Sequence, residues 1–210
     1  MIEKIKQIKA ALFGINDPNA DYPFNGDKFI LEEFAKLINN YNIQTIIETG
    51  TYKGATTECL AMLAEYVITI ENNELYYMSA KKRLSKYNNI ALFKGSSPKV
   101  LNNSVLNSSY LFIKPILFFL DAHWYSYNPL LDELKTIAKF GLNNSVIAIH
   151  DFKVPNKNFG YDNYNNMDYC WEYIEKDIEK IYGEKNYSYY YNEEAEGAKR
   201  GIIYITPKNL

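Results

Sequence analysis

The chain has 210 residues, of which 47% are hydrophobic, and its formal net charge is -2. This length and composition indicate one globular domain with its own core. No apolar run is long enough to span a bilayer and no secretory leader is recognised, so a cytoplasmic protein without a membrane span is expected. The charge balance does not favour a nucleic acid as partner. Cys59 and Cys170 are far apart in the sequence, in helix-like stretches, and are interpreted as reduced thiols.

The first 26 residues do not follow the pattern of the rest of the chain. The start, MIEKIKQIKAALF, is typical of a short amphipathic helix, and a loop-rich stretch follows it. We expect residues 1–26 to form a cap or lid over a site and residues 27–210 to form a single domain.

From there on, short β-rich runs alternate with helical patterns. Strands are expected at 44–50, 66–72, 89–95, 116–122, 145–151, 187–192 and 201–206, and helices at 26–41, 55–66, 74–87, 97–107, 129–140 and 168–183. The first five strands are apolar nearly throughout, which is typical of parallel strands buried on both faces. The sequence therefore predicts a doubly wound, mostly parallel, seven-stranded α/β sheet of Rossmann-like type, ending in an antiparallel strand pair.

Polar residues follow each of the five apolar strands. They are Glu48-Thr49-Gly50, Glu71-Asn72, Gly95-Ser96-Ser97, Asp121-Ala122-His123 and His150-Asp151. Open α/β sheets bind ligands at the carboxyl ends of their strands, near the point where the strand order reverses. These side chains are therefore predicted to share one binding site.

The turn IIETGTYKGATT, at residues 46–57, has two glycines four positions apart. This spacing differs from the dinucleotide fingerprint, and the turn lacks the lysine that ends a P-loop. An anionic Glu48 would repel a phosphate but suits a cation such as an α-amino group. Glu71 ends the next strand, where a carboxylate can accept two hydrogen bonds from a ribose diol. The pattern favours an adenosine with an amine-bearing tail over a nicotinamide dinucleotide or another nucleotide; a site that has lost its ligand is the third alternative.

This turn, followed by VITIENN, resembles the first motifs of the class I S-adenosylmethionine-dependent methyltransferases. The likeness is greatest to small-molecule O-methyltransferases of the catechol type, which have the same acid, the same two glycines and an aromatic residue between them. The resemblance implies that the cofactor is bound by Glu48, Gly50, Thr51, Tyr52, Gly54, Thr57, Glu71, Asn72, Ser96, Ser97 and Asp121. Trp124 or His123 would cover the face of the adenine.

The chain has two histidines, His123 and His150, and each is expected at the end of a strand beside an aspartate. A hydroxyl that receives a methyl group must lose its proton, and a base whose pKa is near the working pH suits that task. At least one of the two histidines is therefore expected to take part in the chemistry. Asp121 and Asp151 end neighbouring strands and are the second pair of catalytic candidates.

A divalent cation, Mg²⁺ or a similar ion, is expected to bind Asp121, His150 and Asp151. In the metal-dependent relatives the fifth strand ends in an acidic pair or in an acid with an amide. His150 departs from that pattern, so the identity of the metal and the need for one stay open. Relatives often have a lysine or histidine base three residues after the acid of strand four. Here Trp124 has that position, so His123 is the first candidate for the base and His150 the second.

The acceptor side is expected to include Tyr161, Asp162 and Tyr164 from the loop after strand five, with Tyr22 and Phe24 from the N-terminal segment. Aromatic rings with acids and amides are typical of sugar sites, and IHDFKVP…GYD resembles methyltransferases of sugar-tailoring and glycan-assembly pathways. The resulting hypothesis is an O-methyltransferase that acts on a hydroxyl of a sugar or glycan intermediate. Three alternatives are kept beside it. These are a catechol-type enzyme, a non-catalytic S-adenosylmethionine-binding module and a nicotinamide oxidoreductase. A homo-oligomer is left open.

Overall fold

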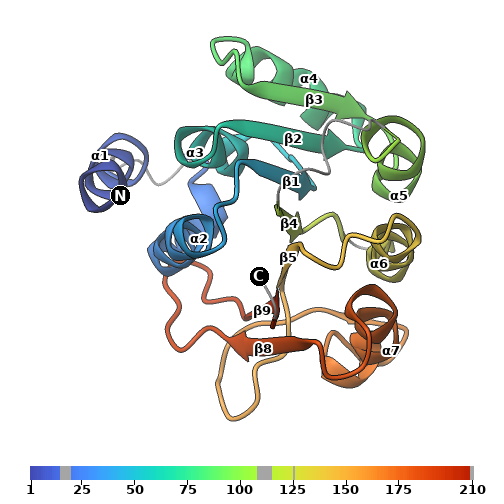
Figure 1. Ribbon diagram of the computed structural model, residues 1–210. Helices are drawn as coiled ribbons and strands as arrows, with labels where there is room; N and C mark the ends of the chain where they lie inside the picture. Colours follow the sequence, from blue (N-terminus) through green and yellow to red (C-terminus); the bar gives the residue numbers. More distant parts are fainter. Residues whose placement is uncertain (15–19, 108–114, 125, 209–210) are drawn as a thin grey trace.

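The computed structural model describes residues 1–14, 20–107, 115–124 and 126–208. Its centre is a seven-stranded sheet in the order β3-β2-β1-β4-β5-β9-β8 (Figure 1). The strands are β1 (Thr45–Thr49), β2 (Tyr66–Glu71), β3 (Ile90–Lys94), β4 (Ile116–Leu120), β5 (Val146–His150), β8 (Tyr187–Tyr191) and β9 (Ile202–Pro207). The first five are parallel, whereas β9 runs antiparallel to β5 and β8 antiparallel to β9. The predicted sheet and its C-terminal antiparallel pair are confirmed.

The strand order reverses between β1 and β4: after β1 the chain continues to β2 on one side of the pair, and after β4 it continues to β5 on the other side. The register aligns Thr49 with Ile70 on one side and with Leu120 on the other. The residues that follow β1 and β4, together with the last residue of β2, therefore meet at one edge of the sheet. The residues expected to bind a ligand lie at this edge.

Helices cover both faces of the sheet (Figure 1). They are α1 (Ile2–Phe13), α2 (Lys28–Asn40), α3 (Ala55–Leu63), α4 (Glu74–Leu84), α5 (Ser97–Val100), α6 (Leu130–Lys139) and α7 (Trp171–Tyr182). Because successive strand residues point to opposite faces, Ile46 and Phe119 pack toward α2 and α3, whereas Ile47 and Phe118 pack toward α6 and α7. All four side chains are buried, so each face of the sheet has its own hydrophobic core.

Two of the helices that flank the site begin at a side-chain cap. The Asp27 carboxylate accepts a hydrogen bond from the Phe29 N–H at 2.8 Å, and the Asn73 side chain accepts from the N–H groups of Leu75 and Tyr76. These bonds satisfy N–H groups that have no partner inside the helix. They fix the residues at which α2 and α4 start, and therefore the positions at which the preceding loops end.

Two segments differ from the sequence-based expectation. The predicted helix at 97–107 is divided into α5 and a π-helical turn, η2 (Leu101–Val105). The loop after β5 contains a small hairpin of β6 (Asn163–Tyr164) and β7 (Met167–Asp168). Its two turn residues, Asn165 and Asn166, have φ values of 53° and 64°. Asparagine tolerates this left-handed conformation, so an Asn pair between the two short strands was the available signal.

The described parts of the N-terminal segment lie in two places. Helix α1 packs on α2 and α3 through the buried Ile8, which places it on a face of the sheet. The 3₁₀ turn η1 (Pro23–Gly26) lies near the start of α3, where the Phe24 N–H donates to the Thr56 hydroxyl. Part of the predicted cap, residues 15–19, lies outside the described residues.

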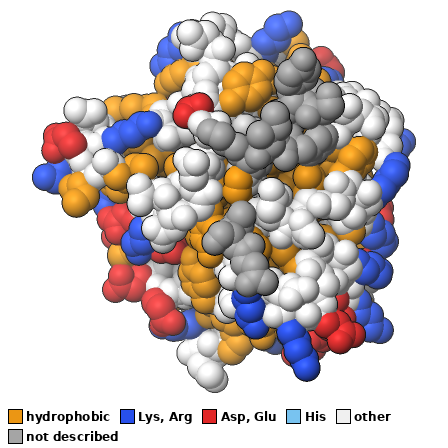
Figure 2. Space-filling model, viewed as in Figure 1, with side chains coloured by type: hydrophobic (Ala, Val, Ile, Leu, Met, Phe, Trp, Pro, Cys, Tyr) orange, Lys and Arg blue, Asp and Glu red, His pale blue; other side chains and the backbone are white. Residues whose placement is uncertain are grey.

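In the described part of the chain, none of the helices is long and apolar enough to cross a membrane. Basic and acidic side chains are interspersed around the outline of the face in Figure 2. This distribution agrees with a net charge of only -2.

Candidate functional site

A cavity of about 510 Å³ opens at the carboxyl edge of the sheet, where β1, β2 and β4 end. Its volume lies in the range of small-molecule and cofactor sites. Its lining residues are Asp21, Tyr22, Asn25, Gly50, Thr51, Tyr52, Ala55, Thr56, Ile70, Glu71, Asn72, Asn73, Tyr76, Gly95, Ser97, Asp121, Ala122, His123, Trp124, Tyr127 and Asp151.

Gly50 is required by the close approach of two strand ends. Its φ is 87°, and a Cβ at this position would lie 2.2 Å from the carbonyl oxygen of Asp121. Only glycine avoids both the strained backbone and the overlap. The turn after β1 is thus held directly against the residue that follows β4, and both line the cavity.

The backbone N–H groups of this turn are already used inside the protein. Those of Gly50 and Thr51 donate to the Ile70 carbonyl oxygen at 3.0 and 3.2 Å, and that of Tyr52 donates to Glu71 Oε2 at 2.7 Å. A phosphate-binding loop needs such N–H groups to point at the ligand. These three donate inside the protein instead, so none of them is available to a pyrophosphate.

Glu71 is the acid held at the cavity wall. Its Oε2 accepts from the Tyr52 N–H, and its Oε1 accepts from the Asn73 N–H at 2.6 Å. Burial raises the pKa of this carboxyl, against the lowering effect of those N–H groups. A carboxylate oxygen has more than one acceptor position, so each can still bind a ligand hydroxyl. The Glu71 carboxylate is therefore held in place at the cavity wall with acceptor capacity to spare.

Glu48, in contrast, lies behind the cavity. It shares its face of β1 with Ile46, below α3, where the hydroxyls of Thr57 and Thr69 donate to its Oε2. Complete burial raises the pKa of Glu48 to about 8. Because Glu48 is not among the lining residues, it is not placed to repel a phosphate in the cavity as the sequence suggested. Glu48 and Thr57 support the turn from below and do not line the cavity.

Most of the remaining residues expected around the cofactor do line the cavity. These are Gly50, Thr51, Tyr52, Asn72, Ser97, Asp121, His123 and Trp124. Ser96 does not; its hydroxyl is 3.0 Å from that of Tyr127, which lines the cavity in its place. Gly54 caps α3 with a φ of 86° and is also outside the lining. Tyr76 was missed by sequence reasoning: its ring centroid lies 4.4 Å from that of Tyr52.

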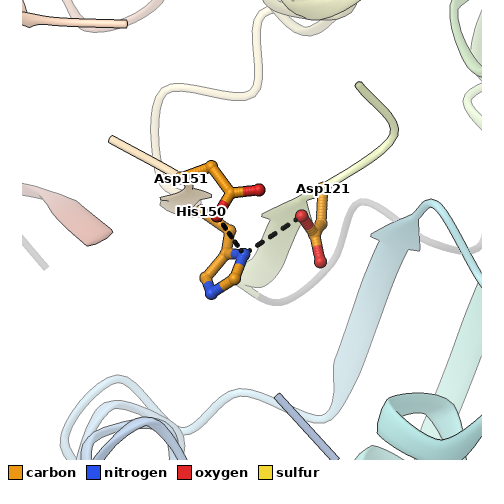
Figure 3. A group of neighbouring side chains, drawn as sticks. All are labelled: Asp121, His150 and Asp151. Carbon is orange, nitrogen blue, oxygen red and sulfur yellow. Dashed lines mark hydrogen bonds and ion pairs between the residues drawn. The ribbon is translucent and has the colours of Figure 1, made fainter. Parts of the chain in front are cut away.

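Asp121, His150 and Asp151 come together as the sequence predicted they would (Figure 3). His150 Nδ1 lies 3.2 Å from Asp121 Oδ1 and 3.3 Å from Asp151 Oδ1. Burial alone would lower the pKa of His150, but the two carboxylates raise it well above its usual value. His150 is buried and does not line the cavity, whereas both acids do.

His123 is the histidine that lines the cavity. Its Nε2 lies 3.1 Å from Asp151 Oδ2, 3.8 Å from Asp121 Oδ1 and 3.9 Å from Asp162 Oδ2. Burial opposes a charge on this ring, yet the bond to Asp151 and the charges of Asp121 and Asp162 raise its pKa. The two histidines therefore lie among three carboxyl groups.

Arg200 completes this cluster, and sequence reasoning missed it. It lies just before β9, and its guanidinium donates through Nε to Asp151 Oδ1 and through Nη2 to Asp162 Oδ1. In the sequence Arg200 was one of several charges in a predicted loop. Its partners are set by the return of β9 beside β5, which no local pattern reveals.

The cluster has the residue types of a cation site, with ligand atoms of Asp121, His150 and Asp151 within 4.8 Å of one another. A metal ligand must offer a lone pair. His150 Nδ1 lies as close to two carboxylate oxygens as ligands of one ion lie to each other, but Asp151 Oδ1 already accepts from Arg200. A divalent cation here would have to compete with the Arg200 guanidinium for Asp151, and the expected Mg²⁺ site stays a prediction.

Of the residues expected to bind the acceptor, Tyr22 lines the cavity. Phe24 is buried, with ring centroids 5.5 Å from Phe34 and 5.8 Å from Phe119, so it belongs to the core. Three other residues lie outside the lining: Tyr161, Asp162 and Tyr164. Asp162 belongs to the acidic cluster, and the Tyr164 hydroxyl donates to its Oδ2. Asp21, Asn25 and Tyr127 are polar lining residues that were not predicted.

No family model matches the chain, and no curated protein matches its sequence. Solved structures do match. An O-methyltransferase from Bacillus cereus, in complex with SAH, is 18% identical with a TM-score of 0.64, and the alignment covers 98% of this chain and 91% of that one. The O-methyltransferase TomG from Streptomyces achromogenes, in complex with SAM, is 14% identical with a TM-score of 0.62, covering 98% and 89%. The chain has the fold of the class I S-adenosylmethionine-dependent methyltransferases.

Proposed function

We propose that this protein is an S-adenosylmethionine-dependent O-methyltransferase. The observation that carries the proposal is the cavity at the point where the strand order reverses, with Glu71 fixed at its wall and a turn that offers no N–H group of Gly50, Thr51 or Tyr52 to a phosphate. The complexes of the Bacillus cereus enzyme with SAH and of TomG with SAM support it.

In this proposal each part of the cavity has one task. Glu71 accepts the ribose hydroxyls, while Asn72 and Ser97 lie beside the adenine. Gly50 leaves room for the methionine end, close to the carboxyl group of Asp121. When bound, the cofactor supplies a sulfonium methyl group that is already activated, so the protein has mainly to align an acceptor with it.

Asp121 and His123 are the members of the acidic cluster that reach the cavity with Asp151, and we place the acceptor hydroxyl beside them. As the new oxygen–methyl bond forms and the sulfur–methyl bond breaks, the hydroxyl proton passes to one of these residues. Asp151 and His150 hold His123 and Asp121 in position. No step in this proposal requires a divalent cation. Whether the protein binds the Mg²⁺ expected from the sequence is measured by titration.

We place a sugar or glycan hydroxyl as the acceptor. The cavity lining combines the aromatic side chains of Tyr22 and Trp124 with the polar groups of Asp21 and Asn25. Such sites stack a ring on the apolar face of a sugar and bind its hydroxyls with acids and amides. The second candidate is a dihydroxy-aromatic acceptor, favoured by the structural similarity to a caffeoyl-CoA O-methyltransferase-like protein from Staphylococcus aureus, at 15% identity and a TM-score of 0.56.

The test is methyl transfer from S-adenosylmethionine to a panel of sugars, nucleotide sugars and catechols, with the methylated product identified by mass spectrometry. We expect transfer to a sugar hydroxyl. Asp151→Asn should bind S-adenosylhomocysteine as the parent does and lose turnover at least about 100-fold. Transfer only to catechols would mean that the acceptor is a dihydroxy-aromatic compound and not a sugar. Tight cofactor binding with no transfer to any acceptor, and the same behaviour in Asp151→Asn, would indicate a binding module.

A further inference from the structure

We propose that Arg200 is a built-in cation, which neutralises the acidic cluster from within the chain and makes a bound metal ion unnecessary there. The inference rests on the proposed function and deepens it, because it states how the acids at the acceptor end are balanced. Arg200 acts through Asp151 and Asp162 and is thus a positioning residue.

The cluster has three carboxyl groups around two histidines, so it holds one acid more than the histidines balance even when both are charged. Carboxyl oxygens of Asp121, Asp151 and Asp162 all lie within 3.9 Å of His123 Nε2. Carboxylates that converge in this way repel one another unless a cation lies between them. The Arg200 guanidinium joins two of the three, from two separate segments of the chain.

The backbone fixes Arg200 in this place. The Gly160 N–H donates to the Lys199 carbonyl oxygen and the Gly201 N–H donates to that of Gly160, both at 2.9 Å. A Cβ on Gly160 would lie 2.9 Å from Arg200 Nη1 and 3.0 Å from its Cδ. The missing side chain at Gly160 thus makes room for the guanidinium.

Asp151 and Asp162 are also held in place by contacts other than those with Arg200. The Asp162 N–H donates to the Asp151 carbonyl oxygen at 2.9 Å, so the two residues that share Arg200 are also joined through their backbones. Asp151 Oδ1 accepts from Arg200, while Asp151 Oδ2 lies 3.1 Å from His123 Nε2. Both oxygens of this carboxylate are therefore occupied by cationic or hydrogen-bonding groups of the chain.

An arginine differs from a metal ion in ways that an experiment can detect. Its guanidinium stays charged at any working pH, its fork matches two carboxylates, and no chelator removes it. The carboxylates that it covers become available for an ion only when it is removed. Removal of Arg200 should therefore create affinity for a divalent cation.

The experiment titrates Mn²⁺ into the full chain and measures free Mn²⁺ by electron paramagnetic resonance. The parent should show no site with a Kd below about 1 mM, whereas Arg200→Met should gain one Mn²⁺ site at least about tenfold tighter. Arg200→Lys keeps a charge and should remain without the site. Lys157→Met is the matched control, because it removes a cation that pairs with Glu193 and should bind Mn²⁺ no better than the parent.

Calorimetric binding of S-adenosylhomocysteine separates this inference from the proposed function. If S-adenosylhomocysteine does not bind the parent, the proposed function fails. The Mn²⁺ titrations of the parent and the Arg200 variants still test whether Arg200 takes the place of a metal ion. The inference is overturned if the parent binds Mn²⁺ stoichiometrically and a chelator stops methyl transfer. It is equally overturned if Arg200→Met, shown to be folded by a cooperative urea unfolding transition, gains no Mn²⁺ site. If Arg200→Met does not fold, Arg200→Lys and the chelator result on the parent decide.

Discussion

Glu48 and Glu71, two acids of neighbouring strands, have different tasks. Glu71 is held by two backbone N–H groups and lines the cavity. Glu48 is buried under α3 and holds Thr57 and Thr69 together. The position of each acid on its strand, and not its sequence motif alone, decides whether it meets ligand or core.

Glu71→Ala is expected to weaken S-adenosylhomocysteine binding at least tenfold. The variant loses two acceptor oxygens for the ribose hydroxyls, and a hydrogen bond to a charged group contributes about 1.5 to 3 kcal/mol. Calorimetric titration measures the change. Glu74→Ala is the control, because that side chain is 68% exposed at the start of α4 and should bind as the parent does. Equal affinities in all three proteins would place the ribose elsewhere.

Glu48→Gln is expected to flatten the dependence of stability on pH. The pKa of Glu48 is about 8 in the folded chain against a reference of 4.5, so the folded state keeps a proton that the unfolded state has lost. The free energy of unfolding therefore falls as the pH rises through this window. Between about pH 5 and about pH 7.5, urea titrations should show the parent losing at least about 1 kcal/mol more than the variant. Parallel curves would mean that Glu48 is ionised in the fold.

At the scale of elements, the turn between β1 and α3 depends on a contact with the end of β4. Gly50→Ala places a Cβ 2.2 Å from the Asp121 carbonyl oxygen and keeps a φ of 87°. Gly141→Ala is the matched control, because Gly141 has a φ of 64° and no atom within 4 Å of the added Cβ.

The control should lose about 1 kcal/mol, which is the cost of a left-handed backbone for alanine. Gly50→Ala should lose about 2 kcal/mol more from overlap and also bind S-adenosylhomocysteine more weakly. Thermal or urea unfolding of both variants gives the comparison. If the two variants were equally stable, the close approach of β1 to β4 would be wrong.

The sequence predicted those elements whose signal is local. The continuous apolar runs of β1 to β5 indicated a parallel sheet, and parallel strands bring their carboxyl ends together, so the meeting of Asp121, His150 and Asp151 could be foreseen. The raised pKa of Glu48 could not be foreseen, because it depends on burial under α3. The ion pairs of Arg200 could not either, because they arise only when β9 returns beside β5.

At the scale of the whole molecule, the sheet brings segments that are far apart in the sequence together around one cavity. Asp21, Thr51, Asn72 and Asp121 all line it, so a ligand that fills it joins the N-terminal segment to three strand ends. Binding to the folded state alone must therefore stabilise the entire domain.

S-adenosylhomocysteine at about 100 times its Kd should raise the free energy of unfolding by about 2.7 kcal/mol. For a chain of this size the melting temperature should rise by about 5 to 10 °C. Differential scanning fluorimetry measures the shift, and Glu71→Ala at the same ligand concentration should show a smaller one. A ligand that binds in calorimetry but leaves the melting temperature unchanged would have to occupy the unfolded chain as well.

The central claim is that the turn at Gly50 and the acid at Glu71 select an amine-bearing adenosine over a phosphorylated one. Its most direct test is calorimetric titration of the parent chain with S-adenosylhomocysteine and, separately, with NAD⁺. We predict one S-adenosylhomocysteine site per chain with a Kd in the range of about 1 to 100 μM and no heat from NAD⁺. Binding of NAD⁺ in place of S-adenosylhomocysteine would contradict the claim.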